Sequence, residues 1–382
     1  MPTHFRTLVT RALVPLALMG AATSAHAQFR TAGAVFAMTN RAGNNEVVAF
    51  SRAVDGKLTQ TGRFPTRGNG IGVDFDTQGG LMLSSDHRFL YACNPGSDDI
   101  TVFAVNGTQL TFLQKIYAGD QPLSVSLSHS GKLLYAMDGS VAGNQITGFT
   151  IAADGKLAPL PDSTKMLSSP IAVPGDVVFS PDDRALVVTQ KVASTIGFTL
   201  DVFLVGADGR PSEALPNQAS GTRPFAATFD RDGHLFVVES GLPVMNNSAV
   251  SSYTLNTATG ALSPLSRSVK DGQTDGCWVV ITKDQRYGYT ANFASGTIAS
   301  FSFGPSGNVR LIKGKAAFSG IRSQPTDLAF SADDNYLYNL LRGTGGVAAY
   351  RIETNGSLTS LGTFGVGGGL PVADGASGLA AY

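Results

Sequence analysis

Short apolar segments alternate with polar turns along most of the chain, and one such pattern occurs six times. In each copy an apolar strand runs into a polar turn of a few residues, and a second apolar strand follows. The copies begin at Leu83 (LSSDHRFLY), Leu127 (LSHSGKLLY), Phe179 (FSPDDRALV), Phe229 (FDRDGHLFV), Ile281 (ITKDQRYGY) and Phe330 (FSADDNYLY). Successive copies lie 44 to 52 residues apart. This spacing is close to the period of propeller blades that contain four short strands.

Each copy continues with a third strand and a tight turn that leads to a fourth. Alternating apolar and polar positions predict third strands over residues 100–105, 250–255 and 347–352. The turns are Asp55-Gly56, Asn106-Gly107, Asp154-Gly155, Asp208-Gly209, Ser306-Gly307 and Asn355-Gly356. Asp-Gly and Asn-Gly are strong hairpin signals because both residues tolerate a positive φ. The pattern therefore predicts an all-β protein of four-stranded antiparallel blades, without helical periodicity in the mature chain.

The two ends of the chain supply the parts of one further blade. Residues 33–39 resemble a second strand without a first, and residues 375–382 (GASGLAAY) resemble the first strand at 324–331 (QPTDLAFS). We therefore predict a seven-bladed β-propeller whose first blade is completed by the C-terminal strand, since closure removes exposed sheet edges. Two separate β domains are the alternative. No linker-like stretch interrupts the period, which favours a single domain over residues 28–382.

Residues 1–27 are typical of a bacterial signal peptide. Arg6 and Arg11 provide positive charge, residues 12–19 are apolar, and Ala25-His26-Ala27 forms a small-x-small cleavage site. The alternative is a membrane anchor, but the apolar stretch is shorter than the roughly 20 residues that span a bilayer. We expect a soluble protein without a membrane span, periplasmic or secreted.

Composition and the rarer residue types narrow the chemistry. Lys and Arg (28) balance Asp and Glu (28) and do not cluster, which argues against a nucleic-acid partner. Cys93 and Cys277 fall in blades that are not neighbours, so we expect buried, unpaired thiols. His87, His129 and His234 fall in or beside turns between first and second strands, at the face opposite the proposed site. This position argues against a Ser-His-Asp triad and against a metal site of clustered imidazoles.

A propeller brings the starts of its innermost strands and the ends of its second strands to one mouth of the central channel. At this mouth Glu239 follows the apolar Phe236-Val237-Val238, which we expect to raise its pKa, so we predict Glu239 to be the general base. Lys191 and Arg223 are predicted to hold a substrate carboxylate and stabilise an oxyanion. The predicted substrate-binding residues are Gln78, Asn94, Gln190, Trp278, Asn292 and Arg342, with Trp278 as a flat platform. The alternative is structural: polar strand ends satisfy loop backbone groups, and Trp278 packs between blades.

Two insertions are expected near this mouth. Residues 66–80 (TRGNGIGVDFDTQGG) contain Gly68, Gly70 and Gly72, but no strand-to-helix context supports a phosphate-binding loop, so a flexible lid or a connector is predicted. Residues 240–248 (SGLPVMNNS) directly follow Glu239 and are expected to overhang the same site.

Several blade sequences resemble the secreted branch of the lactonase-type seven-bladed propellers. They are SPDDRALVVTQKVASTI, DGCWVVITKDQRYGYTANFASGTIASF and QPTDLAFSADDNYLYNL. That group includes 6-phosphogluconolactonases and 3-carboxy-cis,cis-muconate lactonizing enzymes, and the resemblance extends from Gly33 to Tyr382. Cytoplasmic lactonases of the family often carry Pro-His at the start of an inner strand. Here the corresponding pairs are Pro122-Leu123, Pro224-Phe225 and Pro325-Thr326, so Glu239 and Lys191 would carry more of the acid/base chemistry.

The resemblance implies a lactonase-type hydrolase, or a related lactonizing cycloisomerase, that acts on a small anionic lactone or cyclic sugar- or aromatic-derived acid. The alternative is a non-catalytic periplasmic binding or scaffold propeller. No cofactor is implied, and a Ca²⁺ ion held by Asn, Asp and Glu oxygens at the channel is left open. The sequence predicts no oligomeric state.

Overall fold

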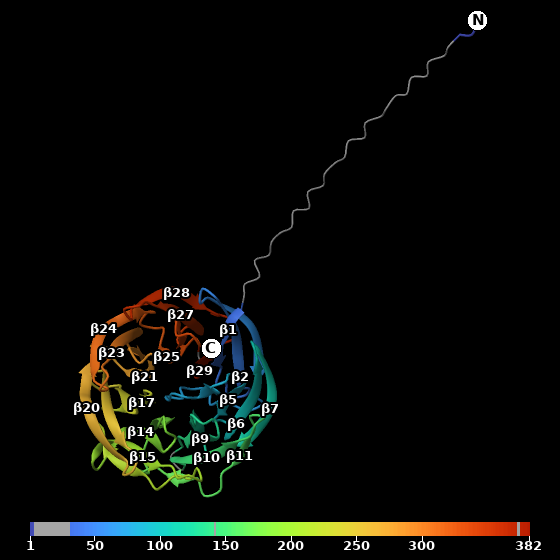
Figure 1. Ribbon diagram of the computed structural model, residues 1–382. Helices are drawn as coiled ribbons and strands as arrows, with labels where there is room; N and C mark the ends of the chain where they lie inside the picture. Colours follow the sequence, from blue (N-terminus) through green and yellow to red (C-terminus); the bar gives the residue numbers. More distant parts are fainter. Residues whose placement is uncertain (4–30, 141–142, 373–374) are drawn as a thin grey trace.

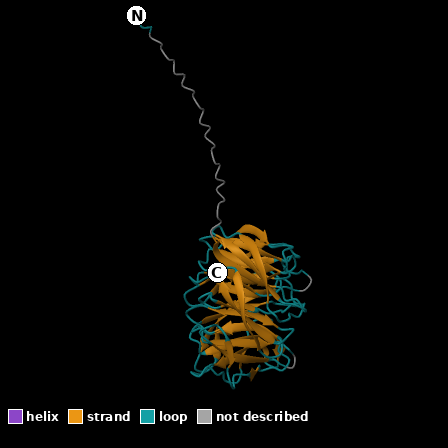
Figure 2. Ribbon diagram, turned by 90° about the vertical axis from the view of Figure 1, so that its right-hand side faces the viewer, coloured by secondary structure: helices purple, strands orange, loops and turns teal. Residues whose placement is uncertain are grey.

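The chain forms a closed ring of seven antiparallel sheets, as Figure 1 shows along the ring axis. The computed structural model describes residues 1–3, 31–140, 143–372 and 375–382. The predicted signal peptide falls almost wholly outside these residues. Seen from the side, the strands form a disc with loops on both faces (Figure 2). Nowhere in the described chain is there a helix long and apolar enough to cross a membrane.

Each blade contributes its first strand to the centre of the ring and its fourth to the rim (Figure 1). Blade 1 comprises β29 (Leu379–Ala381), β1 (Thr31–Met38), β2 (Glu46–Ala53) and β3 (Leu58–Pro65). Blade 2 comprises β4 (Leu81–Leu83), β5 (Phe89–Asn94), β6 (Asp99–Asn106) and β7 (Gln109–Tyr117). Blade 3 comprises β8 (Pro122–Leu127), β9 (Leu133–Asp138), β10 (Gln145–Ile151) and a fourth strand in two pieces, β11 (Leu157–Pro159) and β12 (Lys165–Met166).

The remaining four blades each have four strands. Blade 4 comprises β13 (Pro174–Phe179), β14 (Ala185–Ser194), β15 (Gly197–Leu204) and β16 (Leu215–Gln218), and blade 5 comprises β17 (Pro224–Phe229), β18 (His234–Glu239), β19 (Ala249–Asn256) and β20 (Ala261–Lys270). Blade 6 comprises β21 (Gly276–Ile281), β22 (Tyr287–Asn292), β23 (Thr297–Phe303) and β24 (Val309–Phe318). Blade 7 comprises β25 (Pro325–Phe330), β26 (Tyr336–Leu341), β27 (Gly346–Ile352) and β28 (Leu358–Phe364). The predicted fold is confirmed.

The C-terminal strand closes the ring, as the sequence predicts. β29 pairs antiparallel with β1, so that Leu379, Ala380 and Ala381 lie opposite Ala37, Phe36 and Val35. Just beyond the strand, the backbone amides of Ala34 and Tyr382 each donate to the carbonyl of the other, at 3.2 and 2.9 Å. Both edges of the first blade's second strand are therefore occupied, and no edge strand is left open at the junction of the termini.

Neighbouring blades are fastened together by a repeated tyrosine contact. A tyrosine hydroxyl of one blade donates to the carbonyl of the glycine in the hairpin turn between the third and fourth strands of the next blade. The pairs are Tyr91–Gly155 (3.1 Å), Tyr135–Gly209 (2.7 Å), Tyr289–Gly356 (3.0 Å), Tyr338–Gly56 (3.0 Å) and, from the C-terminal residue, Tyr382–Gly107 (3.0 Å). Blades 4 and 5 carry Val187 and Val237 at the position of these strand tyrosines. We call these contacts the tyrosine clasps.

Apolar side chains from adjacent blades fill the spaces between sheets and form the core. Cys93 and Cys277 are both buried and unpaired, as predicted. His87, His129 and His234 lie in or beside turns between first and second strands, also as predicted. These turns place the three imidazoles at the face opposite the ends of the second strands.

Candidate active site

The direction of each polar side chain at the channel mouth follows from strand alternation. Successive residues of a strand point to opposite faces. The last second-strand residue that pairs with the innermost strand lies opposite the first residue of that strand: Glu239 opposite Pro224, Gln190 opposite Pro174, and Asn292 opposite Gly276. These three side chains are fully buried inside their blades. The next residue along the chain is then directed toward the mouth.

Glu239 is enclosed within blade 5. One carboxylate oxygen accepts a hydrogen bond from the Ser251 hydroxyl at 2.5 Å and the other accepts one from the Ser268 hydroxyl at 2.6 Å. Both serines belong to outer strands of the same blade. Burial raises the pKa of Glu239, as expected from its apolar flank, while the serine hydrogen bonds and the Lys270 charge lower it. With no exposed surface, the carboxylate has no face open to a substrate at the mouth.

The predicted amide ligands occupy the same kind of buried position. The Asn94 amide donates to Asp99 and Thr101 in β6, the Asn292 amide donates to Thr297 in β23, and the Gln190 amide donates to Asp201 in β15. Their partners lie on the third strand of the same blade. These amides therefore have the structural role that the sequence analysis gave as its alternative to substrate binding, because their hydrogen bonds connect strands of one blade and do not point into the channel.

Asp138 is the equivalent residue of blade 3 and carries a testable pH effect. Burial raises its pKa to about 8, although Gln145 donates to one carboxylate oxygen at 2.9 Å. The folded state therefore holds a proton that the unfolded state releases above about pH 4. Stability from this group is present at low pH and is lost as the pH rises toward about 8.

We expect Asp138→Asn to raise the free energy of unfolding at pH 8 by at least about 2 kcal/mol and to leave it nearly unchanged at pH 4.5. The pKa of about 8 lies roughly four above the ordinary value, and a difference of one in pKa corresponds to about 1.4 kcal/mol. Urea unfolding at both pH values measures this difference. Asp162→Asn, at an exposed loop residue, is the matched control. An equal change at both pH values would contradict the assignment.

Lys191 and Arg342 each follow the last second-strand residue that pairs with the innermost strand, and both reach the channel mouth. The Lys191 ammonium lies 4.4 Å from the centre of the Phe225 ring and donates to the Asp76 carboxylate at 2.7 Å. The Arg342 guanidinium forms an ion pair with Asp74. Their anionic partners come from the insertion at residues 66–80, a segment whose chemistry the sequence analysis did not assign.

Part of that insertion crosses the channel, and we name residues 74–78 the channel plug. The Thr77 hydroxyl donates to the Leu123 carbonyl of blade 3 at 2.9 Å, and the Thr77 carbonyl accepts from the Trp278 indole of blade 6 at 3.2 Å. Gln78 accepts from the Val279 amide at 3.0 Å and donates to Asp176 of blade 4 at 3.3 Å. Because it contacts inner strands of three blades, the segment is not a flexible lid. It is a connector, as the alternative expectation had it, but it joins β3 to β4 through anchored contacts inside the channel.

The plug changes the roles of two predicted binding residues. Trp278 is 1% exposed and packs against Phe225, with ring centres 5.2 Å apart, so its indole offers no open platform. The side-chain oxygen of Gln78 accepts from Val279 and its nitrogen donates to Asp176, so both polar atoms are engaged in anchoring the plug. Phe75 is also buried, which directs the flanking Asp74 and Asp76 toward the mouth, where both remain partly exposed.

Arg223 and Asp275 complete the charged cluster. Each immediately precedes an innermost strand and has a left-handed backbone, with φ of 54° and 64°. Burial raises the pKa of the half-buried Asp275, the nearby Asp76 and Asp74 raise it further, and the Cys277 thiol and Arg223 lower it. The Cys277 thiol donates to the Asp275 carboxylate at 3.3 Å. We call Asp74, Asp76, Lys191, Arg223, Asp275 and Arg342 the mouth cluster.

The mouth cluster combines three cations with two carboxyl groups, Asp74 and Asp275, whose pKa values are raised by burial. It brings together Lys191, Arg223 and Arg342 as the sequence predicts, and it includes Asp275, a residue before an innermost strand for which no role was predicted. Glu239 does not join it. Within the described residues, no group of three or more His, Cys, Asp or Glu side chains is arranged to hold a metal ion.

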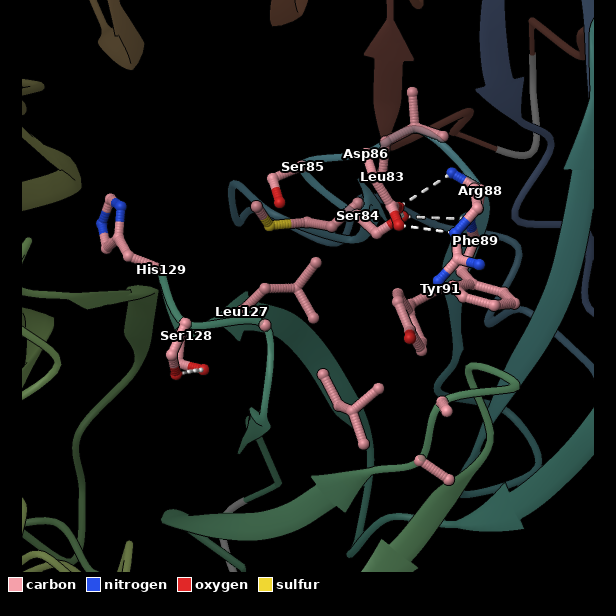
Figure 3. Close-up of a pocket in the computed structure, with 16 residues that line it drawn as sticks. Leu83, Ser84, Ser85, Asp86, Arg88, Phe89, Tyr91, Leu127, Ser128 and His129 are labelled. Atoms are coloured by element: carbon pink, nitrogen blue, oxygen red, sulfur yellow. Dashed lines mark hydrogen bonds and ion pairs between the residues drawn. The ribbon is translucent and has the colours of Figure 1, made fainter.

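Cavities on the opposite face are a recurrent feature of the blade joints. A cavity of about 450 Å³ lies between blades 2 and 3 and is lined by Ser84, Arg88, Tyr91 and His129 among others (Figure 3). Similar cavities lie between blades 3 and 4, 4 and 5, and 6 and 7, at the equivalent turns. Asp86 in the first of them is tied to its own turn by Ser84 and Arg88. This repetition indicates a property of the propeller scaffold.

The fold and the mouth cluster define a seven-bladed propeller with a polar site at one end of its channel. The sequence profile described as "Lactonase, 7-bladed beta-propeller" matches residues 18–175 and 199–323, well over half of the chain. The protein therefore belongs to the lactonase family of seven-bladed β-propellers. No curated protein sequence matches the chain.

Solved structures share this architecture at low sequence identity. A proposed 6-phosphogluconolactonase from Bacteroides uniformis has a TM-score of 0.66 and 18% identity, covering 86% of this chain and 94% of its own. The periplasmic gluconolactonase of Pseudomonas aeruginosa has a TM-score of 0.66 and 18% identity, covering 91% and 98%. A protein of unknown function from Desulfotomaculum acetoxidans has a TM-score of 0.66 and 14% identity, covering 91% and 98%. At this level of identity the likeness shows the fold.

Proposed function

We propose that the protein hydrolyses a small lactone at the mouth cluster. The observation that supports this most directly is the combination of a partly buried carboxyl group of raised pKa, Asp275, with the neighbouring Arg223 guanidinium. Family membership and the gluconolactonases among the structural relatives favour the same reaction class. Fold alone does not fix an activity, so the proposal rests on the site.

In this mechanism Asp275 acts as the general base. Its carboxylate removes a proton from water as the water oxygen attacks the lactone carbonyl carbon. Arg223 stabilises the negative charge that develops on the carbonyl oxygen. The bond from the carbonyl carbon to the ring oxygen then breaks, and protonated Asp275 returns the proton to the departing alkoxide, which gives an open-chain hydroxy acid and the starting enzyme.

Glu239 does not take part in this proposal, although the sequence favoured it. Its two oxygens are occupied by serine hydroxyls inside blade 5 and its side chain is fully buried. Asp275 meets the requirement for a base that a substrate can reach, because it is half-buried at the mouth.

A panel of aldonolactones and muconolactones, assayed with the wild type and Arg223→Gln, tests the function. We expect hydrolysis of at least one lactone above the spontaneous rate. We also expect kcat to fall by at least about tenfold in Arg223→Gln, because the variant lacks the charged donor to the oxyanion. Absence of any turnover by the wild type would contradict the proposal and support a binding or scaffold role.

We also propose that the protein is exported to the periplasm or the medium. The support is the charged, apolar and small-residue pattern of residues 1–27. The periplasmic gluconolactonase with the same fold is consistent with this location.

A further inference from the structure

We propose that Asp74 and Asp76 are specificity-determining residues that make the channel mouth select uncharged, polyhydroxylated lactones over phosphorylated or carboxylated ones. This inference rests on the lactonase function proposed above and concerns the same site. It replaces the sequence-based expectation of an anionic substrate, which assumed that Lys191, Arg223 and Arg342 were available to bind an anion.

Two of the three cations of the mouth cluster are held in ion pairs with the plug. Lys191 pairs with Asp76 at 2.7 Å, and Arg342 pairs with Asp74. Arg223, the proposed oxyanion donor, makes no ion pair among the described residues and interacts with Asp275 only over a longer distance. The cluster therefore holds three basic and three acidic side chains. An arriving phosphate or carboxylate would meet the plug carboxylates as well as the cations, and like charges at short range repel.

The plug carboxylates are held in place and cannot swing aside without breaking several contacts. Asp74 accepts a hydrogen bond from the Asp76 amide at 3.0 Å through the oxygen that does not face Arg342. Lys191 binds both the carboxylate and the backbone carbonyl of Asp76. The buried Phe75 between them and the anchored Thr77 after them fix the backbone at both carboxylates. The ion pairs are thus built into the segment that crosses the channel.

Lys191 has little capacity to accept a second anion. Its side chain is 1% exposed, whereas that of its partner Asp76 is 42% exposed and that of Asp74 is 29% exposed. A ligand at the mouth therefore meets carboxylate oxygens before it meets the ammonium group. An ionised carboxylate can accept hydrogen bonds but cannot donate them, and the hydroxyl groups of a sugar lactone can donate them. The exposed carboxylates of Asp74 and Asp76 are therefore suited to accept hydrogen bonds from the hydroxyl groups of a neutral polyol lactone.

The test compares a matched pair of lactones that differ by one phosphate group. Glucono-1,5-lactone and 6-phosphoglucono-1,5-lactone are assayed with the wild type and with the double variant Asp74→Asn/Asp76→Asn. The control is Asp154→Asn/Asp162→Asn, which removes the same number of negative charges at exposed residues of blade 3. We expect the wild type to prefer the uncharged lactone at least tenfold in kcat/KM. We expect the double variant to lose at least tenfold of that preference, mainly through a lower KM for the phosphorylated lactone, while the control keeps it.

A calorimetric titration with inorganic phosphate makes the inference independent of catalysis. We expect the double variant to bind phosphate at least tenfold more tightly than the wild type. Melting curves of both proteins serve as the control for folding. If the wild type prefers the phosphorylated lactone, or if the variant leaves both the preference and phosphate affinity unchanged, the inference is wrong and the lactonase proposal stands. If neither lactone is hydrolysed but the variant gains phosphate affinity, the proposed function fails while the role of the two aspartates is upheld.

Discussion

Removal of residues 378–382 is expected to prevent stable folding. The truncation deletes β29, exposes one edge of β1, and removes the reciprocal hydrogen bonds between Ala34 and Tyr382. It also removes the Tyr382–Gly107 clasp and the Gly378 amide that donates to the buried Asp327 carboxylate at 3.0 Å. We expect the free energy of unfolding to fall by at least about 4 kcal/mol, a decrease typical of variants that break a buried hydrogen-bond network. Circular dichroism and urea unfolding measure it.

Two controls separate ring closure from the loss of individual side chains. Tyr382→Ala keeps β29 and loses only the hydroxyl contact and ring packing, so we expect it to fold with a loss of about 1–2 kcal/mol. A synthetic peptide of residues 375–382, added to the truncated protein, is expected to restore cooperative unfolding by supplying the missing strand. A truncated protein as stable as the full chain would show that β29 does not close the ring.

Asp275→Asn is expected to lower kcat by about 100-fold or more, the usual contribution of a general base. The amide is nearly isosteric with the carboxyl group but cannot take a proton from water. In the wild type, burial raises the pKa of Asp275 above its ordinary value, and the base must be ionised to act. The rate of the wild type should therefore fall as the pH is lowered through this raised pKa, and this acid limb should be absent in Asp275→Asn.

Glu239→Gln is the informative comparison, because the sequence favoured Glu239 as the base. Its carboxylate accepts hydrogen bonds from Ser251 and Ser268 inside blade 5 and does not face the mouth, so we expect the variant to keep kcat within about threefold. Because burial raises the pKa of Glu239, as it does for Asp138, we expect the variant to gain stability relative to the wild type as the pH rises. Initial rates over pH 4 to 8 and urea unfolding distinguish the two roles. A large loss of kcat in Glu239→Gln with normal rates in Asp275→Asn would overturn the mechanism.

The repeat pattern was sufficient to predict the fold. The period of the apolar segments, the glycine-containing turns and the incomplete blades at both ends follow from local rules of strands and hairpins. The resulting topology also predicted that Lys191, Arg223 and Arg342 meet at one mouth, although they lie in different blades. These features depend on short-range chemistry repeated many times.

Glu239 was misplaced for a reason visible in the sequence. Glu239 ends a second strand, whereas Lys191 and Arg342 each come one residue after the equivalent position. A shift of one residue turns a side chain to the other face of a sheet. Aligning the second strands by their buried positions would have assigned Glu239 to the blade interior with Asn94 and Asn292.

The position of the channel plug could not be predicted from local sequence patterns. Its anchoring bonds join residues remote in sequence, such as Thr77 to Trp278, and nothing within residues 66–80 specifies those partners. The alternation Asp74-Phe75-Asp76 was a partial signal, because an apolar residue between two acids suggests a segment with one buried and one exposed side. It could not show which strands would cover Phe75.

The tyrosine clasps are unevenly distributed around the circle, and this has a consequence for motion. Blades 4 and 5 carry Val187 and Val237 instead, so neither the joint between blades 4 and 5 nor that between blades 5 and 6 has a clasp from a second-strand tyrosine. At the first of these joints Asn217 replaces the tyrosine, because its side-chain amide donates to the Gly260 carbonyl at 3.0 Å and accepts from the Leu262 amide at 2.9 Å. We therefore expect amide protons to exchange earliest at the joint between blades 5 and 6. Arg223 and Asp275 directly precede the innermost strands of these two blades, so opening of this joint would alter the spacing between the proposed oxyanion donor and the proposed base.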